Sequence, residues 1–108
     1  MSNDIMKIYN MLYSPIITPY NLLENAKLEN YSYVKYYKDN HGIIAEMECS
    51  IASEGLKTFY YHFDKNDFLQ RVYLDDGSNK LLVFDRDDQL NKAKTEYYKV
   101  KSIDTLAV

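Results

Sequence analysis

The sequence predicts an α+β domain in which two N-terminal helices pack on one face of a five- to six-stranded antiparallel meander sheet. Three observations support this fold class. Apolar residues recur at helical spacing only in the first 30 residues. After that the period changes to two, and strand-like segments follow at about 8–12-residue intervals, separated by short polar turns. The length of 108 residues suits a single domain over residues 1–108.

Two helices are predicted, over residues 4–13 and 18–29. The first carries one apolar stripe at i, i+3, i+4 and i+7, made of Ile5, Ile8, Tyr9 and Leu12. Pro15 ends it, because the residue before a proline is pushed out of the helical region. The second helix is expected to begin with Thr18 as its cap and Pro19 at its first position, where a proline is well tolerated.

The rest of the chain reads as strands joined by turns. Strands are predicted over residues 31–38, 43–52, 56–64, 68–74 and 80–84, with a sixth over 97–103. The segment 85–94 is polar and fits either a helical turn or a loop. Strands that follow one another through short turns usually pair as antiparallel neighbours, which gives a meander. Because the helices cannot enter this sheet, they are expected to pack on one of its faces.

Alternation in the second strand indicates which face is buried. One side of this strand is apolar throughout and is expected to face the core; it comprises Ile43, Ala45, Met47, Cys49 and Ile51. The other side carries Glu46 and Glu48 and is expected to face water. A shift of one residue would exchange the two faces, so the assignment is testable through the reactivity of Cys49.

Composition and charge narrow the classes of function. The net charge is −3, which disfavours binding to a nucleic-acid backbone. The lone cysteine excludes an internal disulfide and a cysteine-based zinc site. No leader-like or membrane-spanning segment is recognisable, so we expect a cytoplasmic protein with no membrane partner.

The sequence contains few groups that could act in catalysis. We predict that the protein is not an enzyme and has no cofactor and no metal site. The two histidines, His41 and His62, fall in a turn and in a strand, and Cys49 belongs to the predicted core face. The acidic segments 64–67 and 75–79 match no calcium loop. Aspartate and asparagine are also the residues with which tight turns bond their own backbone, and this is the expected role.

Tyrosine is the unusual feature, with 12 Tyr and no Trp. Tyr31, Tyr33 and Tyr37 are expected on one face of the first strand and Tyr36 on the other, so some rings must be partly exposed. Tyrosine favours interfaces, because it offers a large rigid surface and a hydroxyl. The candidate binding residues are Tyr31, Tyr33, Tyr36, Tyr37, Glu46, Glu48, Tyr60 and Tyr61. The alternative interpretation, that tyrosine simply fills strand positions of a compositionally biased chain, stays open.

These features favour a small non-enzymatic protein-binding module, such as an immunity- or inhibitor-type protein of bacterial or phage origin. Its partner would be another protein with a basic surface, bound by a tyrosine-rich acidic sheet face. Two alternatives remain open: a small-ligand-binding domain with a pocket between helices and sheet, and a homodimeric structural subunit. No motif in the chain indicates a particular family.

Overall fold

The computed structural model describes residues 6, 8 and 17–106, with side-chain surroundings as far as residue 99. The chain divides into two compact units, Ile17–Asp85 and the pair of segments Met1–Ile16 and Arg86–Val108, and each is described by itself. The helix predicted over residues 4–13 lies outside the described residues, apart from Met6 and Ile8, which are helical. The expectation of a single domain remains a prediction.

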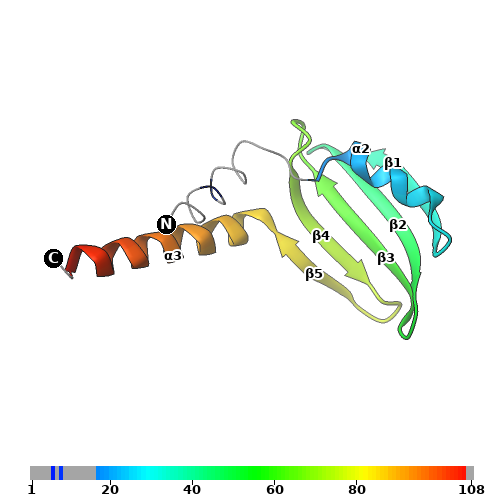
Figure 1. Ribbon diagram of the computed structural model, residues 1–108. Coiled ribbons are helices and arrows are strands. Elements are labelled where there is room, and N and C mark those ends of the chain that lie inside the picture. Colours follow the sequence, from blue (N-terminus) through cyan, green and yellow to red (C-terminus); the bar gives the residue numbers. More distant parts are fainter. Residues whose placement is uncertain (1–5, 7, 9–16, 107–108) are drawn as a thin grey trace. The chain divides into compact units, whose positions relative to one another are not determined.

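The first unit is built on a five-stranded antiparallel sheet, which confirms the predicted α+β class (Figure 1). Its strands are β1 (Tyr31–Lys38), β2 (Ile43–Ile51), β3 (Gly55–Phe63), β4 (Leu69–Asp75) and β5 (Lys80–Asp85). The spatial order is β1-β2-β3-β4-β5, so each strand pairs with its neighbour in the sequence. Each strand begins and ends within one residue of its predicted range.

One short helical segment precedes the sheet. α2 (Pro19–Leu22) is capped as expected: the Thr18 hydroxyl accepts from the Asn21 backbone N–H at 3.4 Å, and the Asn21 side chain accepts from the Thr18 N–H at 2.8 Å. The prediction of one helix over 18–29 is too long, because a 3₁₀ segment, η1 (Leu23–Lys27), follows at once. η1 buries no residue, so no apolar face is present to hold a longer α-helix against the sheet.

The C-terminal part corrects the sequence-based prediction. Residues 97–103 are not a sixth strand; they belong to α3 (Arg86–Leu106), a helix of 21 residues. Asp87 and Asp88 lie in its first turn, where the helix dipole favours negative charge, and Lys92 pairs with Asp88 at 3.1 Å. No glycine or proline interrupts the segment, so the alternation after Tyr97 could not override helix propensity.

The core of the first unit lies between the sheet and α2. It contains Leu22, Ala45, Met47 and Phe63, none more than 7% exposed. Cys49 is also buried, so the predicted face of β2 is the one that meets the core, although its end residues Ile43 and Ile51 are only half-buried.

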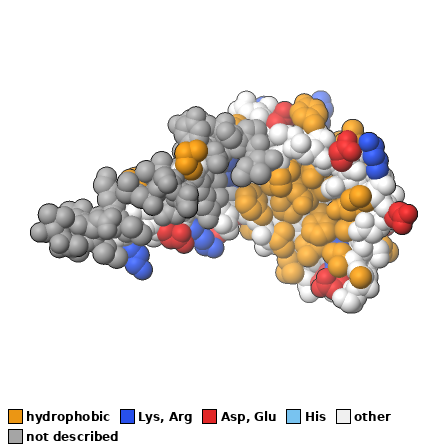
Figure 2. Space-filling model, viewed as in Figure 1, with side chains coloured by type: hydrophobic (Ala, Val, Ile, Leu, Met, Phe, Trp, Pro, Cys, Tyr) orange, Lys and Arg blue, Asp and Glu red, His pale blue; other side chains and the backbone are white. Residues whose placement is uncertain are grey.

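The helical segment covers only part of this face. α2 and η1 pack against β1 and β2. Farther along the same face, β3 to β5 present hydrophobic side chains beside the helix (Figure 2). They include Phe59 and Leu74, which are half-buried, and Leu81, which is 50% exposed. Among the described residues of Ile17–Asp85, α2 and η1 therefore leave part of this apolar surface uncovered.

Candidate functional site

The strand register separates the sheet into a helix side and an open face. Directly paired residues of antiparallel strands point to the same face. Glu46 pairs with Lys35 of β1 and Tyr60 of β3, and Tyr60 pairs with Tyr73 of β4. We call this side, opposite α2 and η1, the open face. Its residues include Tyr33, Lys35, Tyr37, Glu46, Glu48, Tyr60, His62, Tyr73 and Lys80.

The structure brings five of the eight sequence-predicted binding residues together on the open face: Tyr33, Tyr37, Glu46, Glu48 and Tyr60. The other three lie on the helix side, because Tyr31 pairs with Cys49, and Tyr36 and Tyr61 each pair with Ala45. The Tyr36 hydroxyl donates to the Pro19 carbonyl at 2.7 Å and so ties β1 to α2.

The predicted orientation of Tyr31 is wrong for a local reason. A β-bulge interrupts the register of β1 between Tyr31 and Tyr33. One extra residue there reverses the alternation, so Tyr31 packs against the core cluster while Tyr33 faces outward. Sequence parity alone could not reveal this shift.

Glu46 is the centre of the open face. Its carboxylate accepts a hydrogen bond from the Tyr33 hydroxyl at 2.7 Å and from the Tyr37 hydroxyl at 3.0 Å, and Lys35 Nζ lies 3.4 Å from it. The Glu46 side chain is only 13% exposed. Desolvation raises the pKa of Glu46, but the two hydroxyl donors and Lys35 outweigh it, so the pKa falls below its usual value. The carboxylate is therefore charged at neutral pH.

The same contacts act on the two tyrosines. The hydrogen bond to Glu46, followed by desolvation, raises the pKa of Tyr33 to about 12. Desolvation, followed by the hydrogen bond to Glu46, raises the pKa of Tyr37 to about 12. Both hydroxyls therefore keep their protons and remain donors over the whole physiological range, which fixes two half-exposed rings on either side of the carboxylate.

Two lysines of the chain lie against tyrosine rings of the open face. Lys35 Nζ is 5.8 Å from the Tyr33 ring centroid and 5.9 Å from that of Tyr37, and Lys80 Nζ is 4.2 Å from that of Tyr60. Lys80 also lies 5.3 Å from the centroid of Tyr73. These are cation–π distances. The chain thus supplies its own cations at these ring faces.

Four of the open-face residues named above were not among the predicted site residues: Lys35, His62, Tyr73 and Lys80. The His62 ring meets Tyr73 edge-on, with centroids 5.2 Å apart. Desolvation lowers the pKa of His62, with smaller effects from Asp39, which raises it, and from Lys80, which lowers it. Alternation along β4 shows which residues of that strand share a face with Tyr73. Whether Tyr60 lies on the same face depends on how β3 pairs with β4.

Cys49 and His62 do not form a nucleophile–base pair. Cys49 is on the helix side, 3% exposed, and burial raises the pKa of its thiol. His62 is on the open face, so the sheet itself separates the two side chains. His41 is in the β1–β2 turn, where its backbone N–H donates to Asp39 at 2.8 Å.

Turn carboxylates bond to the backbone, as the sequence predicted. Asp76 accepts from the N–H groups of Ser78 and Asn79, both at 2.9 Å, and Asp64 accepts from Asn66 at 2.9 Å and from Phe68 at 3.0 Å. Backbone donors lower the pKa of Asp76. Among the described residues, no group of three or more His, Cys, Asp or Glu side chains is arranged to hold a metal ion.

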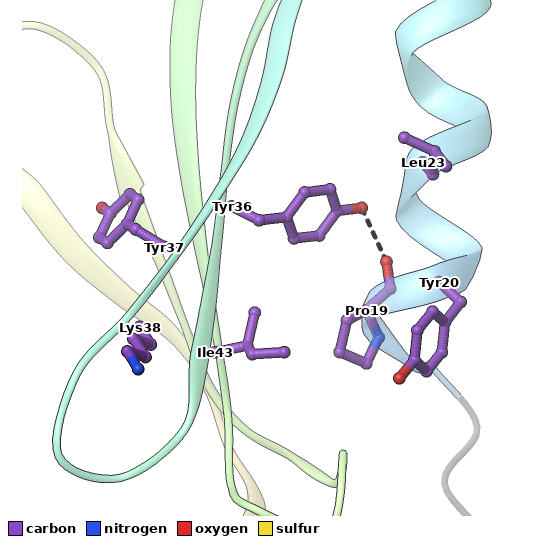
Figure 3. A pocket seen from close by; sticks show the side chains of 7 residues that line it. All are labelled: Pro19, Tyr20, Leu23, Tyr36, Tyr37, Lys38 and Ile43. Carbon is purple, nitrogen blue, oxygen red and sulfur yellow. Dashed lines mark hydrogen bonds between the residues drawn. The ribbon is translucent and has the colours of Figure 1, made fainter.

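A pocket of about 390 Å³ lies between α2 and the β1–β2 hairpin, on the helix side. Its lining consists of Pro19, Tyr20, Leu23, Tyr36, Tyr37, Lys38 and Ile43. Figure 3 shows Tyr36 pointing across it toward Pro19, with Tyr37 on the opposite side of the strand. A volume of this order is in the range of small-molecule sites. The hydroxyl of Tyr36 is already bonded, so the pocket offers mainly an apolar surface.

No match was found when the chain was compared with protein-family models, curated proteins and solved structures. None of the helices in the described part of the chain is both long enough and apolar enough to cross a membrane. The site must therefore be interpreted from its own geometry. Chemically, the open face offers fixed aromatic rings, hydroxyl groups and a mixture of charges, which suits recognition of another surface.

Proposed function

We propose that this chain is a non-enzymatic protein-binding module that engages its partner through the open face of the sheet. The observation that carries the proposal is the Glu46 carboxylate, held between the hydroxyls of Tyr33 and Tyr37 at 2.7 and 3.0 Å. Tyrosines fixed in this way lose little conformational entropy on binding, which is how rigid aromatic residues contribute affinity.

The arrangement of the rings supports a protein partner. Tyr33 and Tyr37 of β1 and Tyr60 of β3 flank Glu46 of β2, so the rings lie on both sides of a central carboxylate. Aromatic side chains with a polar tip are enriched where proteins meet, because they bury apolar area and still satisfy a hydrogen bond. Within Ile17–Asp85, both helical segments pack on the other side of the sheet.

The negative net charge of the chain favours a basic partner through long-range electrostatic attraction. The net charge of −3 attracts such a protein and increases the rate of encounter. On the face itself Lys35 and Lys80 lie over the rings, so a cation of the partner must displace a lysine or bind at Glu48 or Asp75. This is the chemistry of an immunity- or inhibitor-type protein acting in the cytoplasm, where the lone Cys49 would stay reduced.

The pocket supports a second candidate function, the binding of a small apolar ligand. Tyr20 and Leu23 line the pocket and are 71% and 59% exposed, so a ligand that enters it can reach both side chains. The two candidates use opposite sides of the sheet, so single substitutions can separate them.

The test compares three tyrosine-to-alanine variants. Tyr60→Ala alters the open face, Tyr20→Ala alters the pocket, and Tyr98→Ala, at a ring that is 60% exposed on α3, is the matched control. Partners captured by the wild-type chain from its native host are identified by mass spectrometry, and each variant is then titrated against the purified partner by calorimetry. We expect Tyr60→Ala to weaken binding by about 1–3 kcal/mol and Tyr98→Ala to bind like the wild type.

Two results would contradict the proposal. If Tyr60→Ala keeps full affinity for every partner, the open face is not the binding surface. If only Tyr20→Ala loses affinity, the pocket is the site and the second candidate replaces the first. Circular dichroism and thermal melting of each variant show whether a loss of affinity is a loss of fold.

A further inference from the structure

Strand β5 ends the sheet with an unusually apolar edge. It pairs with β4 on one side, and no other described strand pairs with it. Three consecutive residues, Leu81, Leu82 and Val83, are 50–52% exposed. An edge strand presents unpaired N–H and C=O groups, and proteins usually protect it with charges, prolines or a covering element.

The opposite edge shows that protection. β1 carries Lys35 and Lys38 along its length, both exposed, and η1 packs against it. β5 places its charges only at its ends, at Lys80 and Asp85, with four apolar residues between them. The two edges of one sheet therefore differ, and only β5 has the features of a pairing edge.

The sequence of β5 is complementary to itself. If a second copy is laid antiparallel beside it with a two-fold axis between Leu82 and Val83, Lys80 comes opposite Asp85 of the second copy. Leu81 then comes opposite Phe84 of the second copy. The symmetry repeats both contacts, so each end of the pair gains an ion pair and the centre is apolar throughout.

A β-bulge in β5 places the residues that would pair in this register on the same face of the sheet. In a regular strand, residues 80 and 85 would point to opposite faces, because their separation is odd. The register between β4 and β5 shifts at Val72/Tyr73, where Val83 of β5 is the extra residue. As a result Lys80 pairs with Asp75 and Asp85 pairs with Arg71, both on the open face, while Leu81 and Phe84 share the helix side.

We infer that β5 is a homodimer interface, at which two copies of this chain join edge to edge into one continuous antiparallel sheet. No described strand pairs with the outer edge of β5, so the second copy adds a strand there and packs beside Leu81, Leu82 and Val83. Asp85 lies 3.4 Å from Arg71 within the chain. Lys80 lies over the Tyr60 ring in the single chain, and in the dimer it turns from that ring toward Asp85 of the second copy, which builds a three-charge row on the open face. The inference is independent of the proposed function, although a dimer would present two open faces.

The primary test is sedimentation equilibrium of the full chain over a range of concentrations up to roughly 0.5 mM, a span that detects weak dimers. Leu82→Lys places a charge on the edge, and Leu56→Lys is the matched control. Leu56 is 59% exposed on the same face, but its strand β3 lies inside the sheet. We expect the wild type and Leu56→Lys to dimerise and Leu82→Lys to raise the dissociation constant at least about tenfold.

Cysteine cross-linking tests the register without relying on a charge. In the proposed pairing, the Cα atoms of Leu82 in the two copies are offset by one residue along the strands. Together with the usual spacing between strands, this offset puts them about 6 Å apart, which is within disulfide range. Leu82→Cys should therefore form covalent dimers under mild oxidation. Lys80→Cys should not, because the two positions lie on opposite ends of the interface. The native Cys49 is buried and gives the background.

The inference is overturned if the wild type remains monomeric at the highest concentration, or if Leu56→Lys and Leu82→Lys lower association equally. Open-ended polymers in place of dimers would also overturn it, because they require an unsymmetrical contact. If circular dichroism shows that Leu82→Lys does not fold, cross-linking of the two cysteine variants decides whether the chain dimerises through β5. Tyr60→Ala should leave dimerisation unchanged, so failure of the proposed function and failure of this inference give different results.

Discussion

Replacing Glu46 by glutamine should destabilise the sheet, and replacing Glu48 should not. Both glutamates lie on β2 and point to the open face, so each change removes the same charge from the same strand. Glu46 accepts from Tyr33 at 2.7 Å and from Tyr37 at 3.0 Å, whereas Glu48 accepts no hydrogen bond from a described side chain. Glu48→Gln is therefore a matched control for charge and position.

The expected magnitude follows from these contacts. A hydrogen bond to a charged group contributes about 1.5–3 kcal/mol, and water at half-exposed rings places these two at the lower end. Glutamine retains one acceptor oxygen, so about one bond is lost. Lys35 is 60% exposed, and its ion pair adds no more than about 1 kcal/mol. We expect Glu46→Gln to cost about 1–2 kcal/mol and Glu48→Gln less than about 0.5 kcal/mol.

Urea denaturation followed by circular dichroism measures the difference. With a slope of about 1–3 kcal/mol per molar, a loss of about 1–2 kcal/mol should lower the midpoint of Glu46→Gln by roughly 0.3–2 M. Equal midpoints for the two variants would refute the central role of Glu46, and so would a loss confined to Glu48→Gln.

Alkaline titration gives a second test of the same network. The pKa values of Tyr33 and Tyr37 are about 12 in the fold, above their ordinary value of 10.0. The folded state therefore binds these protons more tightly, so the stability they add is complete below pH 10 and is lost as pH rises toward 12. In Glu46→Gln the ultraviolet titration of these two tyrosines should move to lower pH. An unchanged titration curve would show that Glu46 does not hold the two hydroxyls.

Further predictions concern the core, the turns and the histidine. Cys49, which is 3% exposed, should react slowly with thiol reagents in the native state and rapidly in denaturant; fast native labelling would mean that the faces of β2 are exchanged. Phe63→Ala should cost about 3–5 kcal/mol in urea denaturation, because the ring is 2% exposed in the core, while Leu56→Ala, at 59% exposure, should cost less than about 0.5 kcal/mol. Gly42→Ala should lower the melting temperature more than Gly77→Ala, because a Cβ at Gly42 would lie 2.7 Å from the Asp64 carbonyl carbon and still closer to the Phe63 carbonyl oxygen, whereas at Gly77 nothing lies within 4 Å. His62 should titrate below its ordinary pKa of 6.5 in NMR spectra; its stabilising effect is present above pH 6.5 and is lost as pH falls through the folded value, and a raised pKa would contradict its desolvation against Tyr73.

Local chemistry was enough to predict the sheet. Strand alternation and turn composition act over a few residues, so the five strands, the cap at Thr18 and the backbone-bonding aspartates could all be inferred from neighbours in the chain. The buried face of β2 followed for the same reason, because five apolar residues in alternation admit only one assignment. The placement of Glu46 between tyrosines of β1 and β3 followed from the meander order.

Strand alternation and turn composition did not decide the rest. The end of the chain forms α3 because helix propensity and an i, i+4 ion pair outweigh a weak alternation at Tyr97. Two bulges, one in β1 and one in β5, place Tyr31 in the core and bring Lys80 and Asp85 to one face. A bulge depends on how two strands fit against each other, and the position of Lys80 over Tyr60 depends on the pairing of three strands. The sequence therefore determined which residues form strands, while only the tertiary structure decided which side chains meet across them, because register is a property of paired strands and not of either strand alone.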